Sequence, residues 1–94
     1  MTQSKFITDR GQTVTIEEKL ASIPYGWSGQ IDVSGVEERE GHIYASDSPS
    51  FYGTYWVLVD GTEMWLEYFL DATVANSFAE EVKQAALIKT QQRH

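Results

Sequence analysis

The sequence predicts a small α+β domain in which an antiparallel sheet of about four to five strands packs against a C-terminal helix, with one short helix near the N-terminus. The 94 residues are 41% hydrophobic and 13% aromatic, which is enough for one core. Short β-rich runs separated by turn residues fill the middle of the chain, and an apolar stripe at helical spacing fills its end. We therefore treat residues 1–94 as one acidic domain and expect residues 1–4 and 90–94 to fray.

Two patterns overlap near the N-terminus. Residues 5–9 and 13–16 are β-rich runs joined by a glycine-containing turn, which indicates a hairpin. Thr15 and Glu18 also have the spacing of a capping box, and apolar residues at helical spacing follow until Pro24. We expect a short helix from about residue 16 to residue 22. The sequence leaves open whether residues 13–16 are a strand or the start of that helix.

The next part of the chain alternates turn residues with short apolar runs. Its Pro, Gly and Ser residues indicate loops, and its alternating apolar residues indicate strands. In chain order we predict a loop at 24–29, a strand at 30–34, an acidic connection at 35–41, a strand at 42–46 and a polar turn at 47–50.

Asp60-Gly61 is the strongest local signal, because it separates two β-rich runs, 54–59 and 63–69. A type I′ turn needs positive φ at both central residues, and Asp-Gly suits it. With these residues at the turn, Trp56 faces Trp65. The predicted register gives one apolar face, which we expect to contact the C-terminal helix, and one mixed face. The apolar face holds Tyr55, Val57, Val59, Met64 and Leu66, and the mixed face holds Trp56, Leu58 and Trp65 with Glu63 and Glu67.

The mixed face has two interpretations. It is either a cross-strand aromatic pair partly covered by the loop at 24–29, or an exposed binding patch. Tryptophan is enriched at binding hot spots, and the carboxylates beside it favour a basic partner.

An apolar stripe near the C-terminus predicts the last helix. Its members are Val74, Phe78, Val82, Ala85 and Ile88, at spacings of four and three. Asp71, Thr73 and Ser77 are all candidate N-caps.

No motif for catalysis, a cofactor or a metal is present. Cysteine is absent, and Gly26-Trp27-Ser28-Gly29 lacks the closing glycine of a nucleophile elbow. The histidines are His42 and the terminal His94, and neighbouring acids along a strand or helix point apart. We expect no enzyme, no catalytic residue, no cofactor and no metal site, with a small enzyme kept as a residual alternative.

The net charge is −7, and it is unevenly distributed. Residues 20–82 contain eleven acids and one base, Arg39, a net of −10. Such a field disfavours direct binding of nucleic acid or an anionic membrane and favours a basic protein surface. The alternative is that the acidity only keeps the protein soluble. No signal peptide or membrane-spanning segment is recognisable, so we expect a cytoplasmic protein.

Two hypotheses from different functional classes follow. The first is an inhibitor that imitates nucleic acid and blocks the basic surface of a nuclease, a CRISPR effector or another DNA-binding protein. Bacterial immunity proteins and phage anti-defence proteins are often of this size and charge. This is an analogy of class, and no motif identifies a family. The second is an assembly adaptor or homodimer that binds through the tryptophan hairpin. Taking both hypotheses together, we expect the protein to be a monomer or a homodimer. The candidate partner-binding residues are Glu37, Glu38, Glu40, Trp56, Glu63, Trp65 and Glu67.

Overall fold

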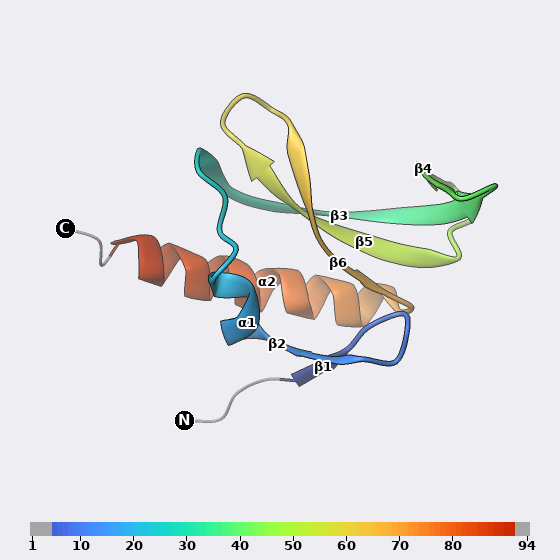
Figure 1. Ribbon diagram of the computed structural model, residues 1–94, viewed down its shortest axis with the longest axis horizontal. Helices are drawn as coiled ribbons and strands as arrows, with labels where there is room; N and C mark the ends of the chain where they lie inside the picture. The colour runs from blue at the N-terminus through green and yellow to red at the C-terminus, as the bar shows by residue number, and fades with distance from the viewer. Residues whose placement is uncertain (1–4, 92–94) are drawn as a thin grey trace.

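The computed structural model describes residues 5–91 and confirms the α+β class (Figure 1). A two-stranded sheet, β1-β2, and a four-stranded antiparallel sheet in the order β4-β3-β5-β6 are accompanied by two helices. The elements are β1 (Lys5–Ile7), β2 (Thr13–Thr15), α1 (Ile16–Leu20), β3 (Trp27–Arg39), β4 (His42–Ala45), β5 (Phe51–Leu58), β6 (Glu63–Phe69) and α2 (Ala72–Gln91).

The hairpin and the helix that the two overlapping N-terminal patterns predict both form, one after the other. β1 and β2 pair as the predicted hairpin, and α1 begins directly after β2. The Thr15 hydroxyl accepts from the Glu18 amide at 3.3 Å, and the Glu18 carboxylate accepts from the Thr15 amide at 3.2 Å, so the capping box is complete. Thr15 serves both elements because an N-cap residue keeps extended backbone dihedrals. The helix ends at Leu20, two residues earlier than predicted.

The predicted acidic connection at 35–41 is wrong, because residues 35–39 belong to β3. This strand pairs with β5 along most of its length and with β4 at its end. The connection is only a two-residue turn, Glu40-Gly41, with φ of 51° and 81°. A type I′ turn requires these positive values, so the turn type expected at Asp60-Gly61 occurs here instead. The loop predicted at 24–29 is also shorter, since β3 begins at Trp27 with an irregularity before Gln30.

The β5–β6 hairpin forms, but its predicted two-residue turn is wrong. The Leu58 amide donates to the Thr62 carbonyl at 2.8 Å, and the Gly61 amide donates to the Leu58 carbonyl at 2.9 Å, so residues 59–61 form a three-residue loop. Gly61 has φ of 91°, the left-handed conformation that such a loop needs.

The longer turn shifts the register of the hairpin by one residue. Trp56 therefore faces Met64, and Tyr55 faces Trp65. A further irregularity restores the predicted pairing of Thr54 with Glu67. The predicted Trp56–Trp65 pair is wrong, and the two rings lie on opposite faces of the sheet, since cross-strand partners share a face.

The core lies between the Trp56 face of the sheet, α2 and the β1–β2 hairpin. Trp56 is 2% exposed and meets Trp27 edge to face at a centroid distance of 5.4 Å. Phe6 packs edge to face on Phe78 at 5.3 Å and on Phe69 at 6.3 Å. The prediction that Tyr55 and Val57 face the helix is therefore wrong, because Thr54 and Trp56 take that side.

The C-terminal helix begins at Ala72, after the first of the three candidate caps. The Asp71 carboxylate accepts from the Thr73 amide at 2.7 Å, which leaves Ser77 inside the helix. Phe78 and Val82 are buried as predicted, whereas Ile88 is exposed. Ala75, Ala79 and Ala86 complete the buried stripe. The expected fraying at residues 1–4 and 92–94 lies outside the described residues, and Thr90 and Gln91 belong to α2.

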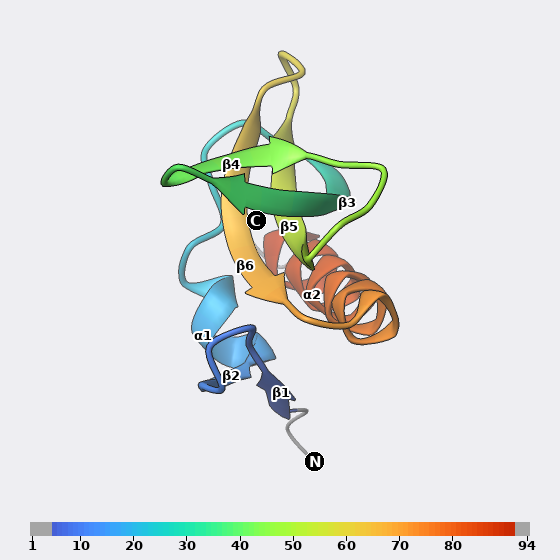
Figure 2. The same ribbon diagram turned by 90° about the vertical axis from the view of Figure 1, so that its right-hand side faces the viewer.

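Figure 2 shows the two layers, with α1, α2 and the β1–β2 hairpin on one side of the four-stranded sheet. No described helix is long and apolar enough to cross a membrane. We call the sheet surface that faces away from α2 the outer face.

Candidate functional site

The outer face presents aromatic and acidic side chains in ordered rows across three strands. The register and the alternation of side chains place Asp32, Tyr55 and Trp65 in one row and Gln30, Val57 and Glu63 in the next. The full set is Gln30, Asp32, Ser34 and Val36 on β3, Phe51, Gly53, Tyr55 and Val57 on β5, and Glu63, Trp65 and Tyr68 on β6.

Three aromatic rings meet around Tyr68. Its ring lies 5.5 Å from that of Trp65 and 5.2 Å from that of Phe51, centroid to centroid. Trp65 is 52% exposed, so its indole is available to a partner. Tyr55 lies over Gly53, where an added Cβ would come within 2.7 Å of the Tyr55 Cζ atom. Glycine at position 53 therefore gives the phenol the space it occupies.

Two carboxyl groups flank β5 on this face. Asp32 comes from β3 and Glu63 from β6, and the Ser34 hydroxyl donates to Asp32 Oδ2 at 2.9 Å. Burial raises the pKa of Glu63, and a hydrogen bond and the charge of Asp32 raise it further. Burial also raises the pKa of Tyr55 to about 12, together with Tyr68 and the two carboxyl groups. Neither Asp32 nor Glu63 forms an ion pair with a base of residues 5–91.

Glu67 is occupied within the molecule. Its carboxylate lies 3.0 Å from the Lys19 amine, and the residue is 8% exposed. The same amine lies 5.5 Å from the centre of the Trp65 ring. Lys19 thus fastens α1 to the edge of the sheet beside the exposed indole.

The β3–β4 hairpin carries the other predicted acids. Glu37 pairs with Arg39 at 3.0 Å, and the Arg39 guanidinium lies 4.8 Å from the centre of the Tyr44 ring. Glu38 and Glu40 are exposed. This hairpin lies at the end of the sheet remote from the β5–β6 turn (Figure 1).

The candidate residues are thus separated into three environments. Trp56 is in the core, Glu37 and Glu67 hold bases of the same chain, and Glu38, Glu40, Glu63 and Trp65 are exposed. Sequence reasoning missed Asp32, Tyr55 and Tyr68 as members of one surface. The signal for Asp32 was its position between Ile31 and Val33, which predicts a side chain on the opposite face from the core.

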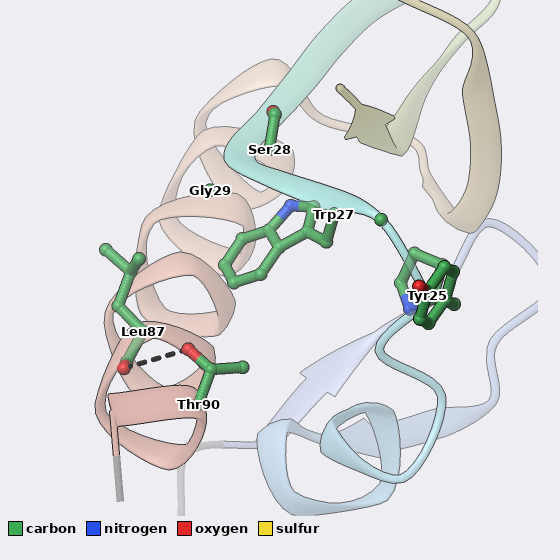
Figure 3. A pocket seen from close by; sticks show the side chains of 8 residues that line it. Tyr25, Trp27, Ser28, Gly29, Leu87 and Thr90 are labelled. Atoms are coloured by element: carbon green, nitrogen blue, oxygen red, sulfur yellow. Dashed lines mark hydrogen bonds between the residues drawn. The ribbon is translucent and has the colours of Figure 1, made fainter. Parts of the chain in front are cut away.

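A shallow hollow of about 330 Å³ lies between the 24–29 segment and the end of α2 (Figure 3). Its lining carries no carboxylate, imidazole or amine. The Trp27 indole beside it donates to the Gln30 carbonyl at 2.8 Å, and the Thr90 hydroxyl donates to the Leu87 carbonyl at 3.1 Å. These groups stabilise the segment and offer no set of catalytic residues.

Within the described part of the chain, nothing supports a metal-binding site or a catalytic histidine. Residues 5–91 hold no group of three or more His, Asp or Glu side chains placed to bind a metal ion. His42 is exposed on β4, with its ring 6.3 Å from that of Tyr44. His94 lies outside the described residues.

Comparison of the chain with protein-family models, with curated proteins and with solved structures found no match. The functional proposal therefore depends on the charge and geometry of the sheet.

Proposed function

We propose that this protein is a small acidic inhibitor that occupies the basic nucleic-acid-binding surface of a nuclease, a CRISPR effector or another DNA-binding protein. The observation that carries the proposal is where the charge lies. Residues 27–69, which contain the whole four-stranded sheet, hold eight acids and one base. Residues 5–26 hold three of each, and residues 70–91 hold three acids and two bases. The net charge of −7 is thus the charge of the sheet layer.

A rigid sheet can present carboxylates as duplex DNA presents phosphates. Duplex DNA carries one charge per roughly 1.7 Å of axis, and the proteins that bind it neutralise its phosphates with clustered Lys and Arg. Neighbouring strands lie about 4.8 Å apart, so the carboxylates that they carry are held close together, and the backbone loses no conformational freedom on binding. The proposed partner is a basic protein, and we propose that the two meet in the cytoplasm.

The exposed acids and the exposed tryptophan supply the proposed contacts. Glu38 and Glu40 extend from the β3–β4 hairpin, and Glu63 lies near Trp65 on the outer face. Glu37 and Glu67 contribute charge while they hold Arg39 and Lys19.

Competition with DNA tests the proposal. The immobilised protein should capture a basic nucleic-acid-binding protein from a lysate of its source cells, and both added duplex DNA and high salt should release that protein. The E38K/E40K variant should bind at least about tenfold more weakly, since each contact is an exposed charge pair.

The matched control is the E80K/E81K variant, which makes the same charge change on exposed residues of α2. It should retain binding. If both variants bind equally, or if DNA does not displace the captured protein, the proposed mimicry is wrong.

An adaptor or homodimer remains the second candidate, and one observation favours it. β4 is an edge strand whose four residues are all exposed, and large apolar side chains on β4 and on β6 face solvent. These side chains are Ile43, Tyr44, Met64 and Trp65. Association through them would be insensitive to salt and would be lost in W65A, and light scattering would report a dimer.

A further inference from the structure

The molecule holds two of its own cations in the same way. Lys19 lies between the Glu67 carboxylate, at 3.0 Å, and the Trp65 ring, at 5.5 Å from its centre. Arg39 lies between the Glu37 carboxylate, at 3.0 Å, and the Tyr44 ring, at 4.8 Å. In both places a carboxylate and an aromatic ring on the sheet share one base. This combination supplies a charged hydrogen bond and a cation–π contact to the same group.

A further set of carboxyl groups and rings lies on the outer face, and it shares the half-exposed Trp65 ring with Lys19. Asp32 and Glu63 supply carboxyl groups from either side of β5, and Tyr55, Trp65 and Tyr68 supply rings. Within residues 5–91 no base is paired with either carboxyl group. Lys19 and Lys83, the bases that approach the edges of the face, are held by Glu67 and by Gln30.

We propose that this set, Asp32 and Glu63 with the rings of Tyr55, Trp65 and Tyr68, receives an arginine side chain of a protein partner. The inference rests on the proposed function, and it names the group through which a basic partner is anchored. The charge of the site and the exposed indole decide the choice of occupant, because an apolar partner would leave both carboxyl groups without a counter-charge.

Arginine fits this site better than lysine does. Its planar guanidinium is weakly hydrated and stacks on aromatic rings, and its several N–H groups can reach two carboxylates at once. The ammonium of lysine is compact and strongly hydrated, and it makes point contacts only. The face is built from three paired strands, so the groups that receive the guanidinium are already in place.

Proton release should accompany binding. The charged and titratable groups around the site are Asp32 from β3, Tyr55 from β5, and Glu63 and Tyr68 from β6, with Lys19 of α1 beside the Trp65 ring. Asp32 and the partial burial of Glu63 favour a proton on Glu63, and an arriving guanidinium favours its loss. Binding should therefore tighten as the pH rises through the raised pKa of Glu63.

The test uses two matched probes and the three indole N–H signals in NMR spectra of the whole protein. Acetyl-Gly-Arg-Gly-amide should shift the Trp65 signal with a dissociation constant on the order of millimolar, and should leave that of the buried Trp56 unchanged. The citrulline peptide, which has the same shape without the charge, should shift neither. The lysine peptide should bind more weakly.

Two neutralising variants and one control locate the site. D32N and E63Q should each weaken the arginine probe at least about fivefold, because each removes a charged hydrogen-bond acceptor. E81Q removes an exposed carboxylate from α2 and should leave the affinity unchanged. The wild-type affinity should rise between pH 4 and pH 7, and E63Q should lose most of that rise.

Three results would each contradict the proposed arginine site. They are shifts that map to Glu38 and Glu40 instead of Trp65, equal binding of the citrulline peptide, and an unchanged affinity in D32N and E63Q. The proposed function fails separately. If DNA displaces the captured partner but the arginine probe does not move Trp65, the mimicry holds without this anchor. If the probe binds but DNA does not displace the partner, the anchor serves another kind of complex.

Discussion

The two tryptophans of the β5–β6 hairpin have opposite environments because one extra turn residue changes the register. Trp56 is 2% exposed against Trp27, whereas Trp65 is 52% exposed beside Tyr68. The side chains are chemically identical, so their consequences for stability should differ through their burial and through the contacts that each ring makes.

Alanine substitutions should separate the two positions. W56A should reduce the free energy of unfolding by about 3–5 kcal/mol, because it leaves a cavity in the core. W65A should reduce it by about 1 kcal/mol or less, since it removes a half-exposed ring and its contacts with Tyr68 and Lys19. Urea unfolding followed by circular dichroism measures both values. A loss in W65A as large as that in W56A would show that Trp65 belongs to the core, and the outer face would not be a binding surface.

Glu63 should make stability depend on pH. Its pKa in the folded protein is raised above the ordinary 4.5, by burial and then by Asp32. A carboxyl group with a raised folded pKa binds its proton more tightly in the folded state, so its stabilising contribution is present at low pH and is lost as the pH rises through the raised value. Glutamine keeps the side chain uncharged at every pH.

E63Q should therefore be more stable than the wild type at pH 7, by about 0.5 kcal/mol after allowance for solvent screening. The difference should vanish below about pH 4, where both side chains are neutral. In a D32N background the stabilisation by E63Q should be smaller, because the charge of Asp32 no longer raises the pKa of Glu63. Thermal unfolding at several pH values measures these differences, and a gain that does not change with pH would contradict the assignment.

At the scale of elements, the Lys19–Glu67 pair joins α1 to β6. The side chains are 18% and 11% exposed, and Glu67 Oε1 also accepts from the Tyr68 amide at 3.0 Å. Removing one partner of a buried ion pair leaves the other charge without its counter-charge, which lowers the free energy of unfolding more than removing both charges together.

K19M should lower the free energy of unfolding by about 1–3 kcal/mol, between the values for exposed and fully buried pairs. E67Q should cost less, because it leaves an amine that can turn to solvent. The double variant K19M/E67Q should recover part of the K19M loss, and the cycle of four proteins gives the coupling energy. Strictly additive losses would show that the contact does not stabilise the attachment of α1.

Local patterns predicted some elements well and others poorly, for physical reasons. The capping box at Thr15 and the cap at Asp71 depend on atoms within a few residues, and both formed. The 35–41 segment was misassigned because its acids are typical of loops, whereas pairing with β5 at residues 35–36 and with β4 at residues 36–39 holds residues 35–39 in a strand. At Asp60-Gly61 the sequence favoured a two-residue turn, and the alternative with Gly61 in the left-handed conformation is equally compatible with those residues.

The candidate surface was harder to predict than the fold because one residue of register moves each side chain to the other face. The shift in the β5–β6 hairpin separated Trp56 from Trp65 and joined Trp65 to Tyr55 and Asp32. The charge could be counted from the sequence. Its neutralisation at Glu37 and Glu67 depends on contacts with Arg39 and Lys19 that only the folded chain makes.

At the scale of the whole molecule, the charge that would attract a partner should also oppose folding. The sheet layer holds eight acids and one base within residues 27–69, and the charges repel one another across neighbouring strands. Salt screens this repulsion, since the Debye length falls from about 30 Å at 0.01 M to about 3 Å at 1 M. Screening should therefore stabilise the folded state while it weakens the binding of a basic partner.

The melting temperature should rise by about 2–4 °C between 20 mM and 500 mM NaCl, which corresponds to about 0.5 kcal/mol for a chain of this size. The E38K/E40K variant, which changes the net charge of residues 27–45 from −3 to +1, should melt higher at low salt and gain less from added salt. E80K/E81K changes the net charge equally but lies on α2, so it should keep most of the wild-type response. Equal gains in the two variants would mean that the response follows the total charge, and the sheet would have no special electrostatic role.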